Sequence, residues 1–255
     1  MNYPNLERLI EIIDILRSEN GCKWDREQTH QTLTRNMLEE AYEAVDAIND
    51  NDMKHLQEEL GDVLLQVVLH AQIAKEENAF TIDDVAKGIS DKLVHRHPHV
   101  FGDVKVESTE EILDNWEKLK KAEKPHRTSI MDGISKAQSA LMSAQKISKK
   151  AVKVGFEWPN EKSLYECVQS EIKEFSEAQS QEDKEEELGD ILFAVVNLAR
   201  WNKIDAEQAL LKANKKFIER FCTMEETANK ELDQLSLEEW DRLWKNAKIK
   251  TKQKI

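Results

Sequence analysis

The sequence predicts an all-α protein made by tandem duplication of one helical-bundle domain. Apolar side chains recur at helical spacing along much of the chain. Only seven glycines and four prolines accompany 34% charged residues, a composition that suits long surface helices better than a turn-rich β architecture. The stretch Glu185–Trp201 (EEELGDILFAVVNLARW) also has a near copy at Glu58–Ala74 (EELGDVLLQVVLHAQIA). These observations predict two copies of one helical unit.

Helical segments are expected throughout the first half. Their approximate ranges are 6–18, 36–48, 58–74, 82–96 and 110–122. Asn20–Thr29 (NGCKWDREQT) interrupts the apolar pattern with a glycine and a tryptophan, which predicts a loop. Pro98 and Gly102 are expected to end the fourth segment. The connection between the second and third segments is short, so these two helices should be antiparallel neighbours.

The second half repeats the first after a candidate linker. Lys121–Ser135 carries Pro125 and Gly133 and lacks an apolar stripe. We therefore expect an N-terminal domain at 1–122, a linker at 123–135 and a C-terminal domain at 136–255. Matched segments lie 124 to 134 residues apart, and they include 21–26 with 155–160, 91–97 with 215–221 and 116–124 with 240–248. This register predicts that both domains have the same fold.

The charge and cysteine content exclude several classes of protein. A net charge of −13 argues against a general binder of nucleic acid or of anionic membranes, because both partners would be repelled. The three cysteines lack metal-ligand spacing and are interpreted as reduced thiols. No apolar run approaches the length of a membrane span, and the N-terminus lacks a cleavable signal. We therefore expect a cytoplasmic protein with no membrane or nucleic-acid partner.

Each half contains two acidic pairs at helical spacing. An ExxE pair lies on one predicted helix and an ExxD pair on the next: Glu40, Glu43, Glu59 and Asp62 in the first half, and Glu171, Glu174, Glu187 and Asp190 in the second. Residues three apart share a helix face, so four carboxylates should converge between neighbouring helices, as in bundle metal sites. An isolated ELGD sequence is most often explained by the preference for acids at helix N-termini, but two matched copies count against that explanation.

The apolar run after each ELGD sequence sets the expected environment of the acids. Ile191–Val196 offers no polar side, so the helix is predicted to be buried all round. Two carboxylates about 4 Å apart repel by roughly 4 kcal/mol at an effective dielectric constant near 20, and four cannot all stay ionised in a core without a cation. Ligation by oxygen alone favours Mg²⁺ or Mn²⁺. The sequence therefore predicts a magnesium site in each half, with manganese as the alternative.

Through these acidic pairs the sequence resembles the MazG nucleoside triphosphate pyrophosphohydrolases, all-α enzymes with an EExxE pattern followed by ExxD. Glu39 completes the first pattern in the N-terminal half, whereas Ser170 stands at that position in the second. The resemblance covers essentially the whole chain. It implies hydrolysis of a nucleoside triphosphate to the monophosphate and pyrophosphate, dependence on Mg²⁺, and a homodimer. The implied catalytic metal ligands are Glu171, Glu174, Glu187 and Asp190.

Basic and aromatic residues of the C-terminal half are candidate substrate contacts. They are Lys216, Arg220, Trp244 and Lys248. The cations would hold phosphates and the indole would stack on a base, although a solvated basic face and a core tryptophan are the plainer explanations. The first-half equivalents are Lys92, Arg96, Lys120 and Lys124. Because a lysine cannot stack as an indole does, we expect both halves to bind metal and the C-terminal half to carry most of the hydrolysis.

Other kinds of site fit the sequence less well. A di-metal carboxylate oxidase needs ExxH on two helices, whereas the ExxH spacing of Glu27 and His30 lies near a loop. A zinc site at His95, His97 and His99 is disfavoured by the helix end there. A non-catalytic regulatory dimer that binds nucleotides also stays open. The sequence leaves undecided the base, the sugar, the phosphorus that water attacks and the carboxylate that takes the proton.

Overall fold

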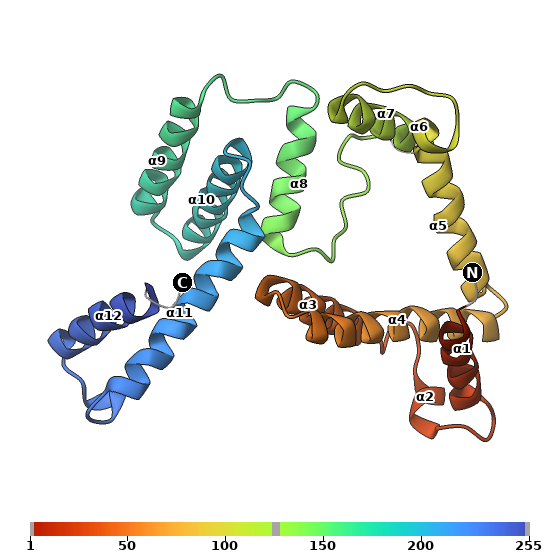
Figure 1. Cartoon of the computed structure of the whole chain (residues 1–255). Coiled ribbons are helices and arrows are strands. Elements are labelled where there is room, and N and C mark those ends of the chain that lie inside the picture. Colours follow the sequence, from red (N-terminus) through yellow and green to blue (C-terminus); the bar gives the residue numbers. More distant parts are fainter. Residues whose placement is uncertain (1–2, 124–127, 253–255) are drawn as a thin grey trace. The chain divides into compact units, whose positions relative to one another are not determined.

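The computed structural model describes residues 3–123 and 128–252 of the chain. The chain divides into two compact units, Met1–Lys124 and Pro125–Ile255 (Figure 1). Every regular element in the described ranges is a helix, which confirms the predicted all-α class. None of these helices combines the length and the apolar character that crossing a bilayer requires.

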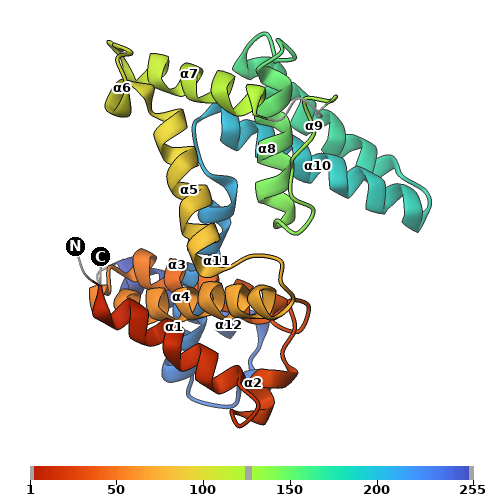
Figure 2. The same cartoon turned by 90° about the vertical axis from the view of Figure 1, so that its right-hand side faces the viewer.

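The first unit is organised around a long central helix, α4. Its elements are α1 (Pro4–Arg17), α2 (Lys23–Glu27), α3 (Thr34–Asp50), α4 (Met53–Glu76), α5 (Ile82–Arg96), α6 (Pro98–Phe101) and α7 (Thr109–Ala122). In Figures 1 and 2, α3 lies beside α4, while α1 packs against α4 and α5 carries α6 and α7. One hydrophobic core cluster of this unit consists of Ile13, Leu33, Val68, Leu69 and Ile73. This cluster joins α1 to α4, and the rest of α4 pairs with α3.

The second unit contains a matching pair of helices, α9 and α10. Its elements are α8 (Ala140–Val152), α9 (Glu161–Glu177), α10 (Gln181–Trp201), α11 (Ala206–Thr227), a 3-10 turn η1 (Leu232–Gln234) and α12 (Leu237–Lys252). Helix α8 packs against α10 as α1 does against α4, and α11 pairs with α12. Buried Met224, Leu243 and Ala247 hold the α11–α12 hairpin together.

Both acidic hairpins are closed by short polar connections. Between α3 and α4, Asn51 adopts the left-handed conformation (φ 55°), which asparagine tolerates better than most residues. Asp52 then caps α4 by accepting hydrogen bonds from the backbone N–H groups of Lys54 and His55. Ser180 starts α10 with a capping box that includes Asp183. In each hairpin the cap therefore starts the helix two turns before the ELGD acids.

The segment predicted as a loop at Asn20–Thr29 contains a short helix, so that prediction was too simple. Helix α2 occupies Lys23–Glu27 within it. The guanidinium group of Arg17 donates to the carbonyl oxygens of Asp25 and Gln28 at the end of this turn. These contacts satisfy carbonyl groups that a helix end leaves without partners. The contact from Arg17 of α1 thus stabilises a helical turn in a segment that the sequence pattern had predicted to be a loop.

The prediction that the ELGD helix is buried all round was wrong for α10. Leu188, Leu192 and Val195 are 47%, 52% and 45% exposed. The buried residues of α10 are Ala194, Val196 and Asn197. Helices α8 and α9 cover only part of its circumference. An apolar face is therefore left open within this unit.

Two boundaries also differ from the sequence prediction. Helix α8 has no counterpart among the predicted segments, although it corresponds to α1 in the repeat. Pro98 ends α5 as expected, but it also begins the short helix α6, where a proline at the first position is compatible with helical geometry. Helix α7 ends at Ala122, and residues 124–127 of the proposed linker lie outside the described residues.

Candidate active site

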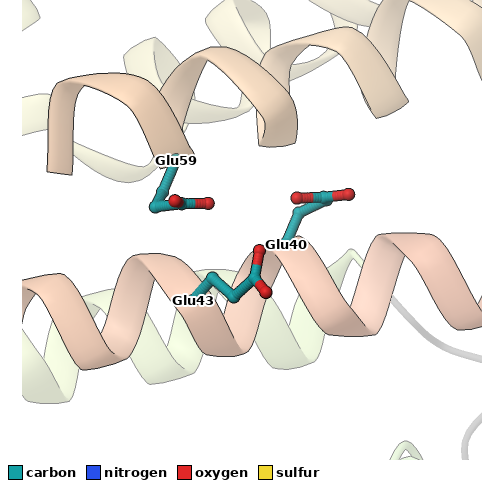
Figure 3. A group of neighbouring side chains, drawn as sticks. All are labelled: Glu40, Glu43 and Glu59. Carbon is teal, nitrogen blue, oxygen red and sulfur yellow. The ribbon is translucent and has the colours of Figure 1, made fainter. Parts of the chain in front are cut away.

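Three acids of the first unit converge between α3 and α4. Figure 3 shows the carboxyl groups of Glu40 and Glu43, carried by α3, close to that of Glu59, carried by α4. One oxygen atom from each lies within 4.8 Å of the other two. The two glutamates of α3 are three residues apart and therefore face α4 together. This arrangement could hold a metal ion.

Burial leaves the first cluster electrostatically unsatisfied. Glu59 is 6% exposed, and its Oε1 atom lies 2.8 Å from Nε2 of His55. Its Oε2 atom is buried and has no hydrogen-bond partner among the described residues. Burial raises the pKa of Glu40 and of Glu43, and the neighbouring carboxylates raise both further. A cation placed among these oxygens would relieve both effects, so the donor set fits a hard divalent ion.

The second unit brings together Glu171 from α9 with Glu187 and Asp190 from α10. One oxygen atom from each again lies within 4.8 Å of the others. Burial raises the pKa of Glu187, and the charges of Glu174, Asp190 and Glu171 add to this shift. Glu187 is half-buried and Asp190 is exposed, so this cluster is more open than the first. It presents carboxylate donors to solvent and includes Asp190, whose counterpart Asp62 is not in the first cluster.

The fourth predicted acid of each half lies beside its cluster rather than within it. Asp62 acts on Glu40 through its charge, and Glu174 does the same to Glu187. Glu174 accepts a hydrogen bond of 2.8 Å from the hydroxyl group of Ser170, the residue that departs from the EExxE pattern. The structure therefore groups three predicted acids tightly in each unit and leaves the fourth within electrostatic reach.

The predicted substrate contacts of the second unit lie on the α11–α12 hairpin. The indole ring of Trp244 is half-buried, with Cζ of Arg220 at 5.7 Å and Nζ of Lys248 at 5.5 Å from its centroid. The ring of Phe217 lies 5.4 Å away. Lys216 is exposed one turn before Arg220. Three of the four predicted contacts thus form one group, in which two cations lie near one aromatic ring.

The equivalent hairpin of the first unit is arranged differently. Arg96 lies 5.3 Å and Lys120 lies 4.4 Å from the ring centroid of Trp116. Arg96 also forms a bidentate ion pair with Glu123. Lys124, the predicted match of Lys248, lies outside the described residues. In this unit Lys120 stands at the position equivalent to Trp244, and Arg96 is already paired with an acid.

The rival sites find no support in the described part of the chain. His30 stacks on His70 with their Nδ1 atoms 2.7 Å apart, and neither belongs to a cluster of metal-ligating groups. His95 is 4.0 Å from Glu123, while His97 contacts the carbonyl oxygen of Leu93. The histidines therefore have other contacts, and the two clusters that could hold a metal are the acidic ones.

Comparison with known proteins identifies the family. A family profile described as "MazG nucleotide pyrophosphohydrolase domain" matches residues 28–101 and 160–223, which together make up more than half of the chain. This chain belongs to the MazG family. The two matched segments fall one in each unit, which confirms the predicted tandem duplication of a MazG domain. The prediction that the chain is an enzyme of this family is confirmed as well.

Several MazG relatives match along almost their whole length. The "Nucleoside triphosphate pyrophosphohydrolase/pyrophosphatase MazG" of Thermotoga maritima is 46% identical over 246 residues, which is 95% of each chain. The "Nucleoside triphosphate pyrophosphohydrolase" of Escherichia coli is 43% identical over 254 residues, covering 95% of this chain and 97% of that protein. The crystal structure of a mazG-related protein from Thermotoga maritima is 33% identical, covers 45% of this chain and 98% of that chain, and has a TM-score of 0.39.

Sequence reasoning missed two neighbours of the MazG acids. His55 contacts Glu59 from one helical turn before it, and this i, i+4 spacing is visible in the sequence. Cys167 has its Sγ atom 3.5 Å from Oε1 of Glu171, and burial followed by this contact raises the pKa of the thiol. The same i, i+4 spacing could have identified it. The two acidic clusters therefore have different neighbours.

Proposed function

We propose that this protein hydrolyses nucleoside triphosphates to nucleoside monophosphates and pyrophosphate, mainly in its C-terminal unit and with Mg²⁺. The observation that carries the proposal is the convergence of carboxylates in each acidic hairpin, with Glu187 held at a raised pKa by burial and by its neighbours. Such a cluster favours a divalent cation, and magnesium held by carboxylates in enzymes commonly serves phosphate groups. Family membership and the names of the relatives support the same reaction.

The acids are assigned to the metal in both units. The proposed ligands are Glu171, Glu174, Glu187 and Asp190 in the C-terminal unit, and Glu40, Glu43, Glu59 and Asp62 in the N-terminal unit. A bound Mg²⁺ ion, which Mn²⁺ could replace, would neutralise charge on the triphosphate and acidify a water molecule. The acids on the two facing helices hold their oxygens in place before substrate arrives, since helices position side chains more firmly than loops do. One of these carboxylates accepts the proton of the attacking water.

The basic and aromatic group is assigned to the substrate. Lys216 and Arg220 hold phosphate oxygens, and the planar guanidinium group of Arg220 can do so with two parallel hydrogen bonds. Trp244 stacks on the base while Lys248 lies on the same ring. In the N-terminal unit Lys120 stands where Trp244 does, and this difference supports the C-terminal unit as the main hydrolase. The domains are proposed at 1–122 and 136–255, with a linker at 123–135.

We also propose a homodimer in the cytoplasm, with no nucleic-acid or membrane partner. The acidic hairpins support the dimer, because each leaves apolar side chains in solvent. These are Leu38, Tyr42, Leu60 and Leu64 in the first unit, and Ile172, Leu188, Leu192 and Val195 in the second. A second copy would bury such a face. The net charge of −13 supports the exclusion of nucleic acid.

A panel of nucleoside triphosphates incubated with Mg²⁺, with products resolved by chromatography, tests the reaction. We expect a monophosphate and pyrophosphate from at least one substrate, and loss of both products with Glu187→Ala. Glu185→Ala is the matched control, because this exposed acid lies on the same helix outside the cluster and should leave turnover unchanged. Orthophosphate with a nucleoside diphosphate as the main products would contradict the proposal. Binding without turnover would favour the non-catalytic regulatory dimer.

A further inference from the structure

In the N-terminal unit an acid is paired with Arg96, the repeat equivalent of Arg220. Nε of Arg96 donates to Oε1 of Glu123 at 3.0 Å, and Nη2 donates to Oε2 at 2.5 Å. The side chains of Arg96 and Glu123 are 11% and 24% exposed, so the pair is partly open to water. A guanidinium group binds carboxylate and phosphate with the same two parallel donors. Glu123 therefore uses the donors that a phosphate group would need.

Two other basic side chains, those of His95 and Lys92, act on this carboxylate. His95 lies 4.0 Å from Oε1 of Glu123. The pKa of the Glu123 carboxyl is lowered, chiefly by its hydrogen bonds with Arg96, with the charges of His95 and Lys92 adding to the effect. Lys92 is the repeat equivalent of Lys216. Glu123 thus lies among the cations that correspond to the proposed phosphate contacts of the other unit.

The C-terminal unit lacks this acid. Ala247 stands at the position equivalent to Glu123, and it is buried in the α11–α12 core. The Nε–H group of Arg220 makes a long contact of 3.5 Å with Oγ1 of Thr251, and its guanidinium group lies near Trp244. No ion pair of Arg220 with an acid is present in residues 128–252. Its charge is therefore available to an anionic ligand.

We propose that Glu123 determines which unit binds the triphosphate, because it occupies Arg96 as an internal anion and so keeps the N-terminal unit from gripping phosphate. The inference rests on the proposed function, which assigns the equivalent Arg220 to phosphate. Glu123 directly follows α7, so its effective concentration near Arg96 is of millimolar order or above. A free phosphate ligand must displace it. A partly exposed ion pair contributes little to stability, so removing this acid should leave the fold intact.

Calorimetric titration of the full chain with inorganic tripolyphosphate and Mg²⁺ tests this role. Tripolyphosphate is chosen because it lacks a base, so its affinity depends on contacts with the phosphate groups alone. All titrated proteins carry Glu187→Ala and Arg220→Ala, which remove the proposed phosphate binding of the C-terminal unit. Adding Glu123→Ala should raise affinity by roughly tenfold to a hundredfold, the range expected for charge-assisted hydrogen bonds made free for a ligand. Glu123→Gln, which keeps the volume and removes the charge, should give a smaller gain.

Two further variants separate a specific effect from a general one. Asp114→Ala removes one exposed acid from α7 and leaves the Arg96–Glu123 pair in place, so affinity should change by about twofold or less. Arg96→Ala added to Glu123→Ala should abolish the gain. Circular dichroism and the melting temperature show that each variant is folded.

The proposal is overturned by unchanged affinity in Glu123→Ala, by a gain that survives Arg96→Ala, or by an equal gain with Asp114→Ala. Its failure is distinguishable from failure of the proposed function. The proposed function is tested by the turnover of nucleoside triphosphates in the unsubstituted chain. That measurement does not use these variants.

Discussion

The two acidic hairpins carry the same acids at the same spacing, but their surroundings differ. In α3–α4 the cluster is deeper, with Glu59 6% exposed and in contact with His55. In α9–α10 it is shallower, and Asp190 faces solvent. The unit with the open cluster also has the aromatic and basic group around Trp244. The comparison teaches that two copies of one fold can keep the same acids while the burial and the neighbours of those acids change.

The largest expected effect separates the two clusters directly. Glu187→Ala or Asp190→Ala should lower kcat by about 100-fold or more, because the transition state loses charge neutralisation of several kcal/mol. Glu59→Ala should have a clearly smaller effect on turnover. Initial rates of pyrophosphate release measure both. If Glu59→Ala were the more damaging change, the roles of the two units would be reversed.

Substitutions in the two cores test whether the two units unfold in separate transitions. Leu33 in the first unit and Leu164 in the second are 1% and 0% exposed. Replacing either by alanine should destabilise its own unit by about 2–5 kcal/mol, through lost burial and the cavity that remains. Calorimetric scans should show that each variant lowers a different transition. A single transition that moves equally in both variants would show that the units unfold together.

Removal of the indole ring tests the assignment of the substrate group. Trp244→Ala should raise KM by roughly tenfold, since stacking on a base is worth about 1–3 kcal/mol. Lys120→Ala, at the equivalent position of the first unit, is the control and should leave KM unchanged. Steady-state kinetics with the best substrate of the panel give both values. A fall in kcat with an unchanged KM would place Trp244 outside base binding.

The smallest expected effect concerns stability and pH. The folded-state pKa of Glu187 is raised above its ordinary value near 4.5, so between the two values the folded chain binds more protons than the unfolded chain. Stability contributed by this group therefore falls as pH rises through that window, and the loss is complete above the folded pKa. In metal-free buffer Glu187→Gln should melt at a higher temperature than the unsubstituted protein at about pH 7, with the difference shrinking towards pH 4.

The same measurement with added Mg²⁺ provides the control. Only the unsubstituted protein should gain stability from the second cluster's ion, so the difference between the two proteins should shrink or reverse. A melting temperature of Glu187→Gln that stays below that of the unsubstituted protein in metal-free buffer would show that repulsion between these acids does not destabilise the folded chain.

The helical class, the duplication and the family follow from the sequence because periodicity and repeated acids are local signals. The positions of Glu40, Glu43 and Glu59 relative to one another follow from helix geometry and one short turn. The exposure of Leu188 and Leu192 did not follow, because how much of α10 is covered depends on which helices pack against it. The ion pair of Arg96 with Glu123 joins residues 27 apart and depends on how α5 meets α7. No periodic pattern in the sequence predicts contacts of this kind.

Each acidic cluster is made by two helices that are consecutive in the chain and joined by only a few residues. Closing so short a loop costs little chain entropy, so contacts of this kind form early in folding. The repulsion between the acids opposes that closure, and a divalent ion bound there would speed it. The availability of the ion during synthesis is therefore expected to affect the yield of folded chain as well as the reaction that the folded chain performs.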